Sequence, residues 1–200
     1  MKTVFAYILF SFVVISSQAE LPQQSNIVEK SVIVDNVAFI KIGTYRGTTD
    51  DGTEYQKSYF YPRYSPKISW FDSRSTCESF GFELTTLETY EEMQIVFNLA
   101  DNYLKTLIDI GIFVDAMTLT LKSTTDWYWA KTGKKLSFAL PWIPGEPNNS
   151  QNANEACLQF GKRTGSAVTG FNDVPCTSTA YTFLCQKIEF SIPLKIEETI

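Results

Sequence analysis

The residues of this chain whose types and spacing could do chemistry are three acids and two amides: Glu146, Asn148, Glu155, Asn172 and Asp173. They come from the motifs "GEPNN", "NEAC" and "FNDVPC", the last two of which contain cysteines. All five side chains offer hard oxygen atoms. Calcium takes about six to eight such ligands from carboxylates, amides, backbone carbonyls and water, whereas magnesium demands tighter geometry and retains more water. The set therefore predicts a calcium site.

Five side chains need not fill the coordination shell of calcium, so positions on the ion would stay open to water or a ligand. Two neighbouring hydroxyls of a sugar could replace that water while the carboxylates accept and the amides donate hydrogen bonds. Pro147 would hold Glu146 and Asn148 in place, and a cis bond before it is plausible because X-Pro bonds adopt cis at low cost. The alternative is that Asn, Gly and Pro here are ordinary loop residues and the acids only solvate the surface.

Composition excludes several other functions. The chain contains no histidine, which removes the usual general base and the commonest zinc ligand. A glycosidase pair of Glu146 and Glu155 would need an acid and a base facing each other across a cleft, and five oxygens around one loop fit an ion better. We therefore expect no enzymatic activity. A net charge of -5 without a strong Lys/Arg cluster also argues against nucleic acid and anionic membranes as partners.

The N-terminus predicts secretion. Lys2 precedes an apolar run over residues 3–15, and a small-residue pattern ends at Ala19, which is typical of a signal peptide. The run is shorter than the roughly 20 apolar residues of a spanning helix, so we expect a secreted, extracellular protein without a membrane anchor. About 180 residues remain, enough for one domain. The predicted organisation is a signal peptide, a leader, one domain and a tail, over 1–19, 20–36, 37–188 and 189–200.

The even number of cysteines in a secreted chain predicts two disulfides, and counting alone leaves three connectivities open. The four are Cys77, Cys157, Cys176 and Cys185. No C-x-x-C pair occurs among them, so metal binding through sulfur is not expected.

The first part of the domain carries β-type signals. Residues 37–45 are rich in β-formers and predict a strand, and the segment 46–58 is turn-rich. The Tyr-rich segment 59–64 predicts a second short edge strand interrupted by Pro62. The stretch therefore forms either a hairpin or an expanded loop.

Two helices follow. Ser69 can cap a helix over residues 70–80, with Gly81 just past its end. Thr89 and Glu92 form a capping box for a second helix, whose apolar residues recur at steps of three and four and are expected in the core. These are Met93, Val96, Phe97, Ala100, Tyr103, Leu104 and Leu107. Short β-type pieces at 126–130, 156–160 and 181–188 complete the pattern of an α+β domain.

In this order, "WFDSRSTC", "WYWAKTGKKL", "PWIPGEPNN", "NEACLQF" and "FNDVPC....YTFLC" resemble a C-type lectin domain from about Phe39 to Lys187. The resemblance implies the double-loop α+β fold of that family, with two helices, short antiparallel strands and the disulfides Cys77–Cys185 and Cys157–Cys176. It also implies that the five oxygen-bearing residues hold calcium and bind the sugar. The spacing and the four cysteines resemble short, secreted members.

The family also relates the Glu-Pro-Asn triplet to the type of sugar. This triplet goes with equatorial 3- and 4-hydroxyls, as in mannose, N-acetylglucosamine and fucose-type glycans, whereas Gln-Pro-Asp goes with galactose. The resemblance thus implies a mannose-type carbohydrate partner and a role in glycan recognition. The alternative is a protein-binding domain of the same fold, in which calcium only orders the loop. In that alternative the Tyr-rich segment 59–64 is the candidate contact patch. Separately, any homo-oligomer would form through the domain surface.

Some residues depart from the family pattern. Phe171 replaces a common tryptophan, and the segment 113–121 lacks the central Trp-Gly motif, which leaves strand placement open there. Asn149 and Ala156 stand where members with an auxiliary calcium site often carry acids, so that site is expected to be missing or weak. The sequon "NNS" has Asn148 as its acceptor. A glycan there would remove a calcium ligand, so our hypothesis is that the sequon stays mostly unused.

Overall fold

The computed structural model of the chain describes residues 32–34, 37–64, 66–103, 111–162 and 169–191. The predicted signal peptide and most of the predicted leader and tail lie outside these ranges. None of the helices in the described ranges is both long enough and apolar enough to cross a membrane.

One antiparallel sheet joins the two ends of the described chain. Its strand order is β1-β2-β3-β10-β4, and the bounds are Val32–Val34 for β1, Val37–Thr48 for β2, Glu54–Pro62 for β3, Cys185–Phe190 for β10 and Glu83–Leu84 for β4. The strand predicted at residues 37–45 is confirmed. Because β1 precedes residue 37 and β10 ends after residue 188, the sheet extends beyond the predicted domain limits on both sides.

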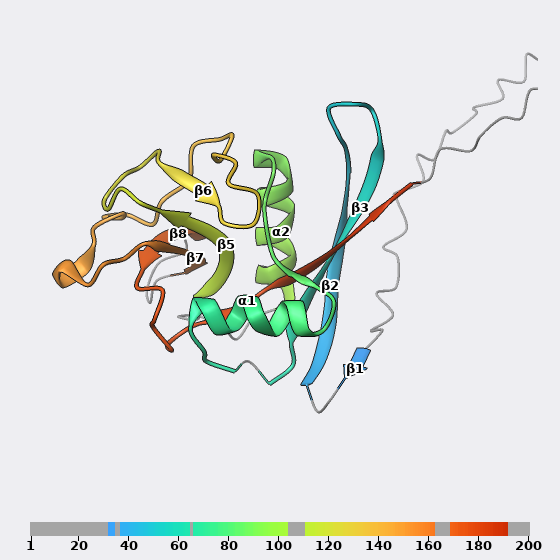
Figure 1. The fold of residues 1–200 in the computed structure, drawn as a ribbon, viewed down its shortest axis with the longest axis horizontal. Coiled ribbons are helices and arrows are strands. Elements are labelled where there is room, and N and C mark those ends of the chain that lie inside the picture. The colour runs from blue at the N-terminus through green and yellow to red at the C-terminus, as the bar shows by residue number, and fades with distance from the viewer. Residues whose placement is uncertain (1–31, 35–36, 65, 104–110, 163–168, 192–200) are drawn as a thin grey trace, which may run out of the picture.

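The segment 46–58, predicted to be turn-rich, is mostly strand. Only the short stretch 49–53 turns, with the amide of Thr49 donating to the carbonyl of Thr53 at 2.9 Å. β3 pairs with β2 on one side and β10 on the other, so the prediction of an edge strand is wrong. The outer half of this hairpin projects from the body (Figure 1), where polar side chains suit a strand exposed to solvent.

The Tyr-rich segment 59–64 is not a surface patch. Tyr59, Phe60 and Tyr61 are buried in β3, and Tyr64 alone among its tyrosines is exposed, at 74%. Period-two alternation is lost here because both faces of the strand are covered. The segment therefore cannot be the protein-contact surface considered from the sequence.

A second sheet carries the loops of the candidate site. Its order is β6-β5-β7-β8, with β9 pairing parallel to β5; the bounds are Ile112–Thr118 for β5, Trp127–Trp129 for β6, Cys157–Lys162 for β7, Thr169–Val174 for β8 and Thr182–Phe183 for β9. The open question at residues 113–121 is resolved, because β5 occupies most of that segment and lies between β6 and β7. Lack of the Trp-Gly motif does not prevent the strand.

Both predicted helices are present. α1 spans Trp70–Ser79, and Ser69 Oγ accepts from the amide of Asp72 at 3.1 Å as expected of its cap. α2 spans Tyr90–Tyr103, and the amide of Glu92 donates to Thr89 Oγ1 at 3.1 Å. Tyr103 is 39% exposed, so its predicted core position is wrong; Leu104 and Leu107 lie outside the described residues.

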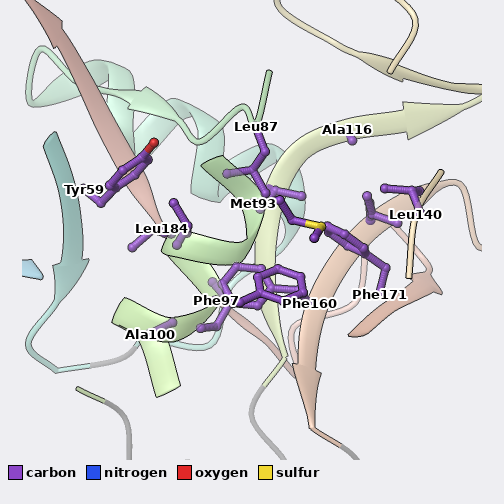
Figure 2. Close-up of a cluster of buried hydrophobic side chains, with 14 of the residues drawn as sticks. Tyr59, Leu87, Met93, Phe97, Ala100, Ala116, Leu140, Phe160, Phe171 and Leu184 are labelled. Atoms are coloured by element: carbon purple, nitrogen blue, oxygen red, sulfur yellow. The ribbon is translucent and has the colours of Figure 1, made fainter. Parts of the chain in front are cut away.

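The core lies where α2 packs between the two sheets, as Figures 1 and 2 show. Met93, Val96 and Ala100 of α2 are buried as predicted. Phe97 stacks on Phe160 with ring centroids 4.7 Å apart and lies 5.2 Å from the ring of Phe171. Phe171 is fully buried, so it has the packing role expected of an aromatic residue at this position.

The two disulfides are Cys77–Cys185 and Cys157–Cys176. Both implied pairings are confirmed. The first ties α1 to β10, and the second ties β7 to the chain just after β8. The second bond joins cysteines that are 19 positions apart in the sequence, and the Asn-Asp pair of the candidate site lies between them.

Candidate calcium and sugar site

The loop 142–149, called the EPN loop below, is fastened at its base to β8. The amide of Phe171 donates to Pro141 O at 2.8 Å, and the amide of Ile143 donates to Phe171 O at 2.9 Å. At Gly170 an added Cβ would lie 2.8 Å from Pro141 O, so the close approach of loop and strand needs a residue without a side chain. The Glu146–Pro147 bond within the loop is cis, as the sequence suggested.

Asp173 connects β8 to the tip of the EPN loop. Its carboxylate is nearly inaccessible, since the residue is 1% exposed. Oδ1 accepts from the amide of Asn148 at 3.0 Å, and Oδ2 accepts from the amide of Asn149 at 2.9 Å. A carboxylate of one motif thus orders the backbone of another.

Glu155, which precedes β7, closes the loop from its other end. Its Oε2 accepts from the amide of Ser150 at 2.5 Å, and its own amide donates to Asn149 Oδ1 at 2.9 Å. Burial raises the pKa of Glu155, and the negative charges of Asp173 and Glu146 raise it further, while the bond from Ser150 lowers it. Asp173 and Glu146 are therefore close enough to Glu155 for their charges to act on it.

Asn149 is a structural residue of the site that the sequence did not reveal. It is 7% exposed and has a positive φ of 46°, a conformation that Asn tolerates better than most residues. Its side-chain oxygen accepts the hydrogen bond from the backbone amide of Glu155. A signal existed in the sequence, because consecutive asparagines after a proline favour a turn.

The two remaining amides of the predicted set differ in their environment. Asn148 Oδ1 is buried and has no hydrogen-bond donor within the described part of the chain, which is rare for a buried polar atom. Asn172 is half-buried on β8 and lies opposite Gln159 of β7. Within the described part of the chain, no hydrogen bond joins the Asn172 side chain to another residue of the set.

The site residues fit calcium in kind. Each can offer an oxygen atom as a metal ligand, and Asn148 Oδ1 is buried with no hydrogen-bond donor among the described residues. Neither Glu155 nor Asp173 forms an ion pair with a described Lys or Arg. In the described ranges no three Asp, Glu, His or Cys side chains alone are arranged to hold a metal. Amide oxygens would therefore have to complete the ligand set, as calcium allows.

Comparison with known proteins places these features in a family. No family model matches the chain. C-type lectin BML-2 of Bungarus multicinctus is 30% identical over 128 residues, covering 63% of this chain and 75% of that protein. CD209 antigen-like protein A of Mus musculus is 28% identical over 146 residues, covering 72% of this chain and 54% of that protein. The chain thus spans about half the length of this mouse relative.

A solved structure shows the same fold. The C-type lectin domain of murine dendritic cell inhibitory receptor 2, in complex with an N-glycan, matches with a TM-score of 0.52 and 23% identity, covering 66% of this chain and 91% of that domain. The predicted α+β lectin-like architecture is confirmed by this likeness and by the two helices, antiparallel sheets and disulfides described above.

Proposed function

Since this chain belongs to the C-type lectin family, we propose that it binds carbohydrate through a calcium ion held by Glu146, Asn148, Glu155, Asn172 and Asp173. The observation that carries the proposal is the meeting of the EPN loop with β8. There, two loop amides donate to Asp173 while Asn148 Oδ1 stays buried without a described donor. An oxygen in that position is suited to a cation.

Electrostatics supports the same proposal. Repulsion among Glu155, Asp173 and Glu146 raises the pKa of Glu155 beyond the effect of its burial. A divalent cation would offset this repulsion, because a bound ion is usually the largest local charge in its site. Calcium, when bound, supplies a point to which two neighbouring sugar hydroxyls can coordinate.

The protein's own contribution is to position acceptors and donors around those hydroxyls. Glu146 and Asn148 flank Pro147, so a carboxylate and an amide stand on either side of a rigid residue. Carboxylates accept hydrogen bonds from hydroxyls and amides can donate to them. This order matches the Glu-Pro-Asn triplet, and we propose a mannose-type ligand with equatorial 3- and 4-hydroxyls, including N-acetylglucosamine and fucose-type glycans.

We further propose that the protein acts outside the cell in glycan recognition, on the basis of the signal-peptide pattern in residues 1–19. The binding of single sugars is expected to be weak, and a homo-oligomer would raise avidity. No catalytic step is assigned to Glu146 or Glu155, since both serve the ion.

The test is retention of the secreted chain on immobilised mannose and on immobilised galactose, in calcium and in chelator. We expect chelator-sensitive retention on mannose, which Asn148→Asp removes. Asn152→Asp, an exposed change in the same loop region, is the matched control, and this variant should still bind to immobilised mannose in calcium. Calcium binding without retention on either sugar would instead support a protein-binding domain in which the ion only orders the loop.

A further inference from the structure

A groove lies between α2 and the base of the EPN loop, formed by residues that the calcium site does not use. Tyr90, Gln94 and Asn98 line it from α2. They recur at four-residue steps, so they share one face of the helix. Pro141 and Thr169 line the groove as well, from the loop base and from the start of β8.

Both walls of the groove are held in place. Tyr90 is 49% exposed, yet its ring packs edge-on against Phe138, with centroids 6.1 Å apart. Ser137 Oγ donates to Glu88 O at 2.8 Å and so fixes the neighbouring loop to the segment before α2. On the other wall, Pro141 O accepts from the amide of Phe171 at 2.8 Å. A ligand would therefore find a preformed surface, which lowers the entropic cost of binding.

The chemistry of the groove suits an uncharged polyhydroxylated ligand. The amides of Gln94 and Asn98 are exposed, and neither side chain forms a hydrogen bond with another residue of the described part. Each amide can both donate and accept, as can a sugar hydroxyl. Asp101 also lines the groove, but its charge is balanced by an ion pair with Lys162. Tyr90 adds an aromatic face beside the amides.

We propose that this groove is a second, calcium-independent subsite for a neutral sugar unit of the glycan. The ring of Tyr90 packs against the C–H face of the sugar, and Gln94 and Asn98 exchange hydrogen bonds with its hydroxyls. The inference rests on the proposed carbohydrate binding of the chain. It extends the proposed ligand from a single sugar to an oligosaccharide.

The position of the groove relative to the calcium site supports an oligosaccharide. Thr169 begins β8, and Asp173 lies four residues further along the same strand. At about 3.3 Å per residue the two positions are about 13 Å apart. Sugar units of one oligosaccharide could therefore reach both places, and two weak contacts on one ligand reinforce each other.

The experiment uses the secreted chain with two probes, methyl α-mannoside and a linear mannopentaose. Side-chain amide signals of Gln94 and Asn98 are followed by NMR during titration with mannopentaose in chelator, and both should shift. In calcium, Tyr90→Ala and Asn98→Ala should each weaken the affinity for mannopentaose about fivefold, the worth of one ring contact or one hydrogen bond. Both should leave the affinity for methyl α-mannoside unchanged. Asn102→Ala, an exposed change on α2 outside the groove, should change neither.

Failure of the subsite and failure of the calcium site are distinguishable. If the amides of Gln94 and Asn98 do not shift in chelator, the groove proposal is overturned, whatever the calcium-dependent retention on mannose shows. Equal losses for both probes in the groove variants would overturn it too, because the groove would then act only through the calcium site. Shifts in chelator without any calcium-dependent retention would uphold the groove and reject the ion site.

Discussion

Two regions of this molecule bury acidic side chains, and they differ in the groups that balance the negative charge. Beneath the β2–β3 hairpin, Lys57 Nζ lies 2.8 Å from Glu92 Oε1, and the two side chains are 2% and 0% exposed. Tyr59 donates to the same carboxylate at 2.6 Å, and the amide of Glu88 donates to its other oxygen at 2.6 Å. This acid has a cation and two further donors, all from the chain itself.

At the EPN loop, Glu155 and Asp173 are also buried, but the described donors to their carboxylates are backbone amides. No Lys or Arg of the described part forms an ion pair with either. Burying a charge is costly unless it is paired. In the hairpin region the positive charge that balances the acid belongs to a residue of the chain, Lys57. The loop region has no such residue among those described and is suited to bind a cation from solution. The first arrangement is permanent, and under the proposed function the second would respond to calcium.

Glu92→Ala should produce the largest effect. It leaves the buried Lys57 with only the more distant carboxylate of Glu88, 3.7 Å from Nζ, and removing the close partner of a buried pair costs about 3–5 kcal/mol. We expect that loss in the free energy of unfolding, measured in urea. Glu91→Ala changes the exposed neighbour and should stay within about 0.5 kcal/mol of the parent. If Glu92→Ala also changed the free energy of unfolding by no more than about 0.5 kcal/mol, the ion pair between Lys57 and Glu92 would not stabilise the fold.

Asp173→Asn should remove the response to the external ion. Calcium at about 100 times its dissociation constant stabilises a single-site protein by about 2.7 kcal/mol, and the variant should lose this increment. Urea unfolding with calcium and with chelator measures it. Asp50→Asn, an exposed change in the hairpin turn, should keep the full increment. Equal calcium stabilisation in the parent and Asp173→Asn would place the ion elsewhere.

The sequence predicted one of these regions better than the other. The five oxygen-bearing residues stand out because acids and amides are concentrated in short motifs, and the structure brings Asn148 and Asp173 into contact. Glu92 was expected to complete a capping box, yet its carboxylate accepts from Glu88 rather than from Thr89. Lys57 lies in a polar segment that resembles a turn. Its burial depends on β10 and α2, which are distant in sequence.

Local signals account for the elements that were predicted correctly. Ser69 and Thr89 mark helix starts through bonds within three residues, so tertiary context is not needed to find them. The placement of β5 was left open because the segment lacks the Trp-Gly motif, and a strand buried on both faces offers no alternation to replace that signal. The disulfide pairing came from family resemblance, since counting cysteines cannot choose a connectivity.

Gly170→Ala should loosen the base of the EPN loop without changing a charge. The added Cβ would lie 2.8 Å from Pro141 O and 2.9 Å from the amide nitrogen of Ile143, and backbone shifts of this kind cost about 1–3 kcal/mol. We expect a cost of about 2 kcal/mol in chelator together with weaker calcium binding, measured by urea unfolding and calorimetry. Gly161→Ala, at the position opposite Gly170 on β7, is the control. Unchanged stability and affinity would mean that the loop does not depend on this close approach.

Asp115 is an intermediate case, and it makes the smallest prediction. It is 1% exposed, Arg74 Nε lies 3.6 Å from its Oδ1, and the amide of Lys131 donates to its Oδ2 at 2.8 Å. Burial raises the pKa of Asp115 from 3.8 to about 6, although the Lys131 amide and Arg74 act in the opposite direction. The distant cation only partly offsets the cost of burial.

Because its pKa is higher in the folded state, Asp115 binds its proton more tightly there than in the unfolded chain. Stability is therefore lost as the pH rises from about 4 to about 6, the full penalty remains above about pH 6, and stability returns as the pH falls back toward 3.8. Between pH 7 and pH 5 this group should add about 1 kcal/mol to the free energy of unfolding. Asp115→Asn should lose that increment in urea titrations made in chelator, and Asp126→Asn, half-buried and paired with Lys135 at the surface, should retain it. If Asp115→Asn follows the parent at every pH, Arg74 compensates the buried charge fully, and Asp115 belongs with the satisfied acids of the hairpin region.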